Sequence, residues 1–150
     1  MLRRILFTAG AFSIFLFVLG SCTDSTAPAQ CKDDTSNVNL TVSSGLTPRF
    51  DWSPNCKIAA ITIYDGNEFA WYANGFADDG HVDLDANRLS SPVTYGVVPS
   101  GATDSQPPVA LAAGHTYTVE LIRVLPPGSN STCVFHYGDA CVMLEQTFVR

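Results

Sequence analysis

Tyr117-Thr118-Val119-Glu120-Leu121 alternates apolar and polar side chains at every residue. Successive side chains of a β-strand point to opposite faces, so this alternation predicts a strand with one face buried and the other in water. The same two-residue period recurs at residues 38–42 and 49–52, and after residue 37 the apolar residues alternate rather than recur at helical spacing. The stretch therefore predicts an all-β, antiparallel fold.

A tight hairpin is expected in the middle of the chain. Ile61 and Ile63 mark a strand, and Asp65-Gly66 supplies the positive-φ turn after which the chain returns through Phe69 and Trp71. Gly, Pro, Asn and Asp interrupt the apolar residues on both sides of this hairpin, as they do between short strands. The other expected elements are an acidic loop at 77–91, an edge strand at 92–98 flanked by prolines, and a last strand at 142–149.

About seven strands, with Trp52 in the second and Leu111, Gly114, Tyr117 and Val119 around the start of the penultimate one, resemble a fibronectin type III domain. In that family the Trp fills the middle of the sandwich and the Tyr hydroxyl bonds back to the chain. The resemblance implies an immunoglobulin-like antiparallel sandwich over residues 37–150. Such sandwiches serve many functions, so the fold alone assigns none.

The N-terminus has the form of an export signal. Arg3 and Arg4 precede a mostly apolar run at 5–19 that is short for a membrane helix. The run ends in Leu19-Gly20-Ser21-Cys22, which resembles the lipobox of bacterial lipoproteins, whose cysteine is acylated after the peptide before it is removed. An ordinary secretory signal with a coincidental cysteine is the alternative. The sequence therefore predicts three segments: a signal peptide at 1–21, lipidated Cys22 with a flexible tether at 22–36, and the sandwich at 37–150.

The lipid anchor implies a bacterial cell-envelope location, with the membrane as partner through the N-terminal lipid. Thr23, rather than Asp, follows the cysteine, and by resemblance this favours the outer membrane. The chain has a formal net charge of −6, and the loss of Arg3 and Arg4 with the signal makes it −8. Nucleic acid is therefore excluded as a partner.

Four cysteines remain after lipidation, an even number suited to an oxidising compartment. Metal ligation is the alternative, but CxxC spacing is absent. Four cysteines allow three connectivities, and the expected strand directions bring all four to one end of the sandwich without deciding among them. Cys133–Cys141 is favoured because Tyr137-Gly138-Asp139 can reverse the chain, which leaves Cys31–Cys56.

The acidic loop offers a weak calcium hypothesis. Asp83, Asp85 and Asn87 have the first spacings of an EF-hand loop, but Arg88 and Thr94 occupy the positions that require Gly and Glu. A solvated acidic loop is the favoured interpretation, and no cofactor is expected. Catalytic motifs are absent from the sequence, so no enzyme activity is expected; a hydrolase using Asp78, Asp79, Asp83 and Asp85 is the least favoured hypothesis.

The favoured function is a protein- or glycan-interaction module on a membrane-anchored envelope lipoprotein. A purely structural spacer without a ligand is the alternative. One hypothesis places the contact surface on the loop at 126–141, held by its disulfide, with Phe135, His136 and Tyr137 at its tip. The alternative is that the disulfide only offsets the flexibility of a long loop. Other aromatic candidates are Tyr72, Phe76 and Tyr95, together with Trp71, which is expected instead to fill the sandwich.

Overall fold

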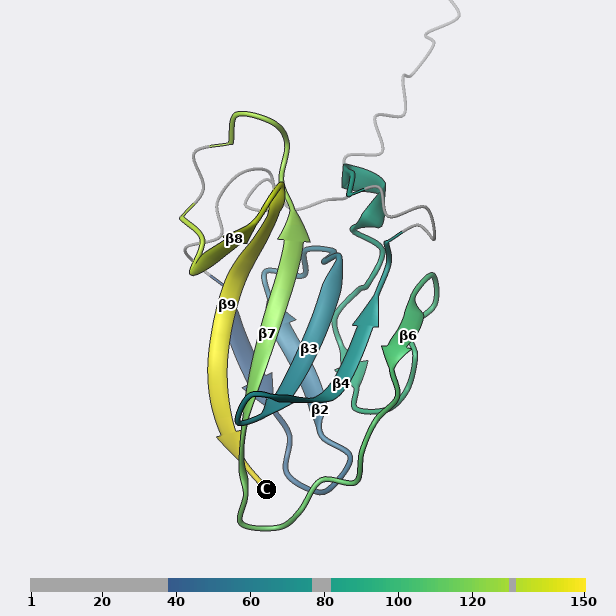
Figure 1. The fold of residues 1–150 in the computed structure, drawn as a ribbon, viewed down its shortest axis with the longest axis vertical. Helices are drawn as coiled ribbons and strands as arrows, with labels where there is room; N and C mark the ends of the chain where they lie inside the picture. Colours follow the sequence, from purple (N-terminus) through teal and green to yellow (C-terminus); the bar gives the residue numbers. More distant parts are fainter. Residues whose placement is uncertain (1–37, 77–81, 130–131) are drawn as a thin grey trace, which may run out of the picture.

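Two antiparallel sheets pack face to face in the computed structural model, which describes residues 38–76, 82–129 and 132–150 (Figure 1). Figure 1 looks onto the larger sheet, with β2 behind it. The smaller sheet has the order β1-β2-β5, comprising β1 (Asn39–Val42), β2 (Arg49–Ser53) and β5 (Val93–Thr94). The larger has the order β6-β4-β3-β7-β9-β8, comprising β3 (Ala60–Asp65), β4 (Glu68–Asn74), β6 (Thr103–Gln106), β7 (Thr116–Val124), β8 (Phe135–Tyr137) and β9 (Ala140–Val149).

The core lies between the sheets, where the alternating positions placed it. Tyr117, Val119 and Leu121 of β7 are buried, whereas Thr118 and Glu120 between them are partly exposed on the other face. β2 follows the same rule and buries its two aromatic side chains against β7 and β9. The predicted all-β sandwich is confirmed, because each sheet buries one face against the other.

The two features implied by the resemblance, a buried Trp and a Tyr hydroxyl bonded back to the chain, are present. Trp52 is 2% exposed, and its Nε1 donates to the carbonyl of Cys56 at 2.7 Å. The hydroxyl of Tyr117 accepts from the backbone N–H of Ala112 at 2.9 Å, beside buried Leu111. The first contact ties β2 to the chain that follows it, and the second fixes the approach to β7.

The β3–β4 hairpin forms as expected, but one of its aromatic residues points the other way. Gly66 adopts a φ of 61° in the turn, which favours glycine. Trp71 pairs with Ile63 and Phe69 pairs with Tyr64, so Ala70 is an extra residue in β4. This bulge places Phe69 and Trp71 on opposite faces. The alternation of Phe69 with Trp71, which would place both rings in the core, is therefore broken here, and the Phe69 side chain is 49% exposed.

Nine strands occur in the described residues, against about seven expected. The additional ones are β6 and β8, at the two edges of the larger sheet. The edge strand expected at 92–98 is confirmed as two-residue β5. Within the expected acidic loop, residues 77–81 lie outside the described residues, and the remainder contains the 3-10 turn η2 (Leu84–Ala86).

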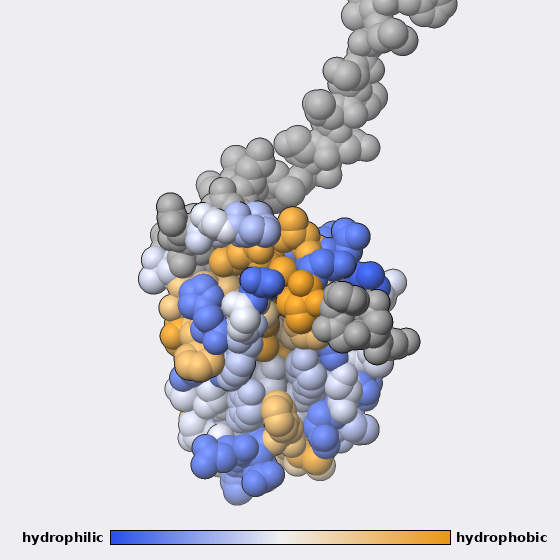
Figure 2. Space-filling model, turned by 45° about the horizontal axis from the view of Figure 1, so that its top comes forward, coloured by the Kyte–Doolittle hydropathy of each residue, from blue (hydrophilic) through white to orange (hydrophobic). Residues whose placement is uncertain are grey.

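One end of the sandwich gathers η2, the β2–β3 connection, the end of β7 and the start of β9. Ala59 donates to the carbonyl of Ile122, and Asn87 after η2 bonds to the backbone of Val124. Turning this end forward shows apolar surface bordered by polar residues (Figure 2). In the part of the chain that the structure describes, no helix has the length and apolar character needed to cross a bilayer.

Candidate functional site

The outer face of the larger sheet carries two adjoining hollows, which together we call the trough. One has a volume of about 270 Å³ and the other about 340 Å³. Tyr64 and Tyr137 line both, so they stand where the two hollows meet. The remaining lining of the first hollow is Thr62, Phe69, Tyr72, Phe76, Ile122 and Ala140, and that of the second is Gly66, Asn67, Thr118, Glu120 and Glu145.

The first hollow, the aromatic end of the trough, owes its depth to residue size. Thr62, Ile122 and Ala140 are buried and form a low floor from β3, β7 and β9. Aromatic side chains from β4 rise on one side of this floor, and Tyr137 of β8 rises on the other. The order of strands in the sheet therefore creates a channel between two aromatic walls, although residue 72 and residue 137 are far apart in sequence.

The rings of one wall form a series. Tyr64 and Phe69 have their ring centroids 5.0 Å apart at an interplanar angle of 35°, and Phe69 and Tyr72 lie 6.1 Å apart at 37°. Tyr137 is 54% exposed and packs edge-on against Phe135 at 4.8 Å. Burial raises the pKa of Tyr72. The wall thus offers exposed ring surface held by neighbouring rings.

The second hollow, the acidic end of the trough, carries a pair of carboxylates. Glu120 of β7 and Glu145 of β9 are direct cross-strand partners, and like charges in that position destabilise a sheet. Tyr64 donates its hydroxyl to Oε2 of Glu120 at 3.3 Å. Burial raises the pKa of Glu120, and the charge of Glu145 raises it further, while the Tyr64 hydrogen bond acts in the opposite direction. Neither carboxylate forms an ion pair within the described residues.

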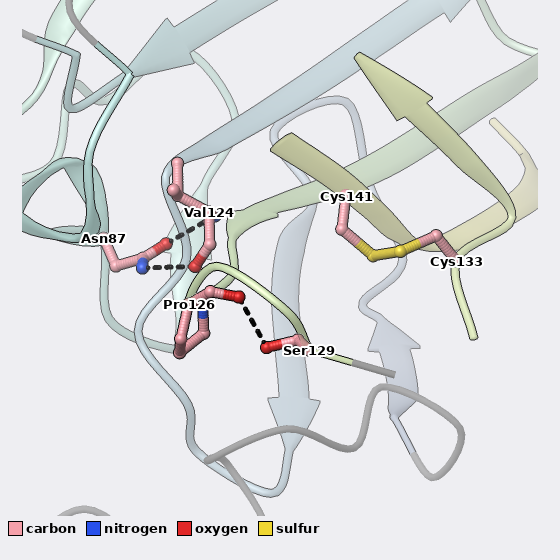
Figure 3. Close-up of a disulfide and its surroundings, with 6 residues drawn as sticks. All are labelled: Asn87, Val124, Pro126, Ser129, Cys133 and Cys141. Atoms are coloured by element: carbon pink, nitrogen blue, oxygen red, sulfur yellow. Dashed lines mark hydrogen bonds between the residues drawn. A yellow bond between two sulfur atoms is a disulfide. The ribbon is translucent and has the colours of Figure 1, made fainter. Parts of the chain in front are cut away.

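A disulfide holds the β8 side of the trough in place. Cys133 and Cys141 are bonded, with their Cα atoms 5.5 Å apart, which confirms this bridge (Figure 3). Gly138, with a φ of 60°, turns the chain between β8 and β9. This disulfide links the residue before the start of β8 to β9, and so holds in place the strand that carries Tyr137.

The predicted contact residues of this segment are not at a loop tip, because they form β8. Phe135 and Tyr137 pair with Val142 and Ala140 on the trough side, and both are more than half exposed. His136 alternates with them and lies over Cys141 on the other face, where it borders a separate hollow of about 130 Å³. The structure therefore brings one of the three predicted residues, Tyr137, into the lining of the trough. Phe135 packs against Tyr137 without lining the trough, and His136 lies on the other face.

The other predicted cysteine sites lie partly or wholly outside the described residues. Cys56 is disulfide-bonded, and Cys31, the partner expected for it, is outside the described part of the chain. The Cys31–Cys56 pairing therefore stays a prediction. Cys22, the expected lipidation site, also lies outside the described residues.

The candidate calcium residues contribute to local structure. The Asp83 carboxylate accepts from the N–H of Ala86 at the start of η2. The Asn87 amide pairs with the backbone of Val124, donating at 2.8 Å and accepting at 3.0 Å (Figure 3). Asp85 is exposed in the same turn. Within residues 38–76, 82–129 and 132–150, no three His, Cys, Asp or Glu side chains are grouped as a metal site would require.

The remaining aromatic candidates divide between core and surface. Trp71 is fully buried and donates from Nε1 to Asp104 at 3.1 Å, so its expected role in filling the sandwich is confirmed. Tyr95 packs edge-on against it at 5.4 Å and is also buried. Tyr72 and Phe76 instead line the trough. Tyr64, Phe69, Glu120 and Glu145 of the trough are not predicted as site residues from the sequence. For Glu120, the only signal is its place at a polar, outward-facing position of the alternating β7 sequence.

Another hollow, of about 380 Å³, lies at the end of the sandwich beside η2. Exposed Val82 and Leu84 line it together with Asp83, Asp85 and Asp139. Its lining residue Val82 directly follows, in sequence, residues outside the described part of the chain, whereas all but Phe76 of the lining residues of the trough lie away from such a boundary. The trough is therefore the better defined candidate site.

No family model, curated protein or solved structure matches this chain. The case for function accordingly rests on the trough and on the N-terminal sequence.

Proposed function

We propose that this protein is a membrane-anchored lipoprotein of the bacterial envelope whose β-sandwich binds a protein or glycan ligand in the trough. The observation that carries the proposal is the pair of aromatic walls above a buried floor. Phe69 stands on one side and Tyr137 on the other, and each ring is about half exposed. Exposed large apolar side chains that gather in a concave site are typical of binding surfaces. The disulfide at β8 favours a site held in shape before its ligand arrives.

The anchor part of the proposal rests on sequence. Leu19-Gly20-Ser21-Cys22 follows an apolar run, and the residues after it are rich in Ser, Thr, Ala and Pro, as flexible tethers are. A diacylated cysteine would hold the sandwich at a membrane without a spanning segment. Thr23 after the cysteine favours the outer membrane in this proposal.

The spacer hypothesis is the main alternative, because a sandwich needs no ligand to act as one. It does not explain why aromatic residues lie on a solvent-facing surface of the sheet. Phe69 is informative here, since the bulge at Ala70 turns its ring out of the core and onto this surface. Bulges that redirect a side chain are common beside functional sites.

Binding of the lipidated protein, in detergent micelles, to fractionated envelope material would test the proposal. The fractions are peptidoglycan sacculi, outer-membrane polysaccharide and envelope proteins, each immobilised separately. We expect one fraction to retain the protein, and Phe69→Ala with Tyr137→Ala to weaken retention at least about tenfold. Leu46→Ala is the matched control, because Leu46 is 57% exposed but does not line the trough.

Equal retention of the double variant and the wild type would contradict the proposal. So would the absence of retention by every fraction, which the spacer hypothesis predicts.

A further inference from the structure

We infer that the ligand of the trough is an uncharged oligosaccharide, bound with sugar rings against the aromatic wall and hydroxyl groups at the acidic end. This inference rests on the proposed function and specifies its ligand class. The trough has two chemically different ends joined at Tyr64 and Tyr137, and a sugar chain offers both kinds of surface in every residue.

The aromatic wall suits flat, apolar faces. Tyr64, Phe69 and Tyr72 are inclined to one another by only 35° and 37°, with centroids 5.0 and 6.1 Å apart. The three rings therefore lie close together, with neighbouring rings at similar inclinations, along one side of the trough. A pyranose ring presents C–H groups on one face, and these carry partial positive charge toward the negative face of an aromatic ring.

The acidic end suits hydroxyl groups, which both donate and accept. Glu120 and Glu145 can accept hydrogen bonds, whereas the Asn67 amide and the Thr118 hydroxyl can also donate. Bonds to an ionised carboxylate are stronger than those between neutral groups. An ammonium or guanidinium group would suit the two carboxylates but only donates, so it would leave the Asn67 and Thr118 donors to water, whereas sugar hydroxyls match both kinds of group.

The charge of the site disfavours anionic ligands. Glu120 and Glu145 face each other across β7 and β9, and no cation pairs with either within the described residues. A ligand carrying carboxylate, phosphate or sulfate groups would add repulsion to a half-buried carboxylate. The uncharged members of the polysaccharide class are the ones that fit.

Isothermal titration of the lipidated protein in micelles, at fixed pH, would test the inference. The probes are neutral hexasaccharides of glucose, mannose, galactose and N-acetylglucosamine, a galacturonic acid hexamer as the matched anion, and an Arg/Lys-rich decapeptide. We expect one or more neutral hexamers to bind, and their dissociation constants should change less than threefold between 50 and 500 mM salt. The anionic hexamer should bind at least tenfold more weakly.

Variants identify the surface. Phe69→Leu keeps apolar bulk but removes the ring, and should weaken the neutral sugar at least fivefold. Glu145→Gln should reduce the ratio of the affinities for the neutral and anionic hexamers by at least threefold. Unfolding midpoints confirm that each variant is folded, and Leu46→Ala is the control with unchanged affinity.

Three outcomes would overturn the inference: no neutral hexamer binds, the galacturonate binds more tightly, or Phe69→Leu leaves sugar affinity unchanged. If the decapeptide binds instead and Phe69→Leu weakens it, the trough remains a binding site while the sugar assignment fails. If Phe69 and Tyr137 prove irrelevant to every ligand, the proposed function fails as well.

Discussion

Removing the Trp52 side chain tests whether the centre of the sandwich is organised as described. The indole is 2% exposed, packs in the core between the two sheets, and donates to the Cys56 carbonyl at 2.7 Å. Trp52→Ala should cost about 3–5 kcal/mol, because a buried aromatic ring is lost and its neighbours fill the space only partly. Trp52→Phe keeps most of the apolar ring but removes the hydrogen bond to the Cys56 carbonyl, and should cost about 1–3 kcal/mol.

Urea unfolding, followed by circular dichroism with the disulfides kept oxidised, measures both losses. The slope of the transition should stay constant while its midpoint falls, which indicates a change in stability alone. Phe69→Ala is the comparison, because half of that ring is exposed and its loss should cost less than half as much as Trp52→Ala. A loss below about 1 kcal/mol for Trp52→Ala would refute the buried mid-sandwich position.

Four further changes test other parts of the molecule. Asn87→Ala should cost about 1–3 kcal/mol in urea unfolding, because it leaves the N–H and the carbonyl of Val124 at the end of β7 without this partner. Asn87→Asp should also destabilise, because it turns a carboxylate oxygen toward the Val124 carbonyl oxygen. Replacing Cys133 and Cys141 together by Ser should lower stability by about 2–3 kcal/mol on the loop-entropy account, and an unchanged midpoint would contradict it. Cys22→Ala should release the protein into the soluble fraction or leave uncleaved precursor, and recovery of a mature lipid-bearing species would disprove the anchor. Glu120→Gln should stabilise at neutral pH, because the raised pKa of this carboxyl makes its ionised form costly when folded. That gain should vanish at pH 3, where Glu120 is protonated in both states.

The sandwich could be predicted because its strands bury one face and leave the other in water. β7 and β2 have that alternation in their sequences, and both bury the expected side chains. β6 has the sequence Thr-Asp-Ser-Gln, so no apolar phase marks it as a strand. β8 has three residues, all exposed, and its pairing with β9 depends on the turn and disulfide rather than on burial.

The trough was not predictable as a unit, because pairing register creates it. The sequence suggested Tyr72, Phe76 and Tyr137 as separate candidates in distant segments. Their convergence depends on which strands of the larger sheet are neighbours. The bulge at Ala70 also reverses Phe69, and a two-residue period cannot reveal an inserted residue.

The edge formed by β6 bears on how this protein tolerates crowding. Its outer side has backbone groups that another chain could pair with, the usual start of strand-to-strand aggregation. β6 is only four residues long, and Pro107-Pro108, which lack N–H donors, follow it. Asp104 turns its carboxylate inward to the Trp71 indole, so a charge sits within the edge itself. An incoming strand would find only four residues to pair with before the two prolines end the edge, so this edge is a poor template for strand-to-strand polymerisation.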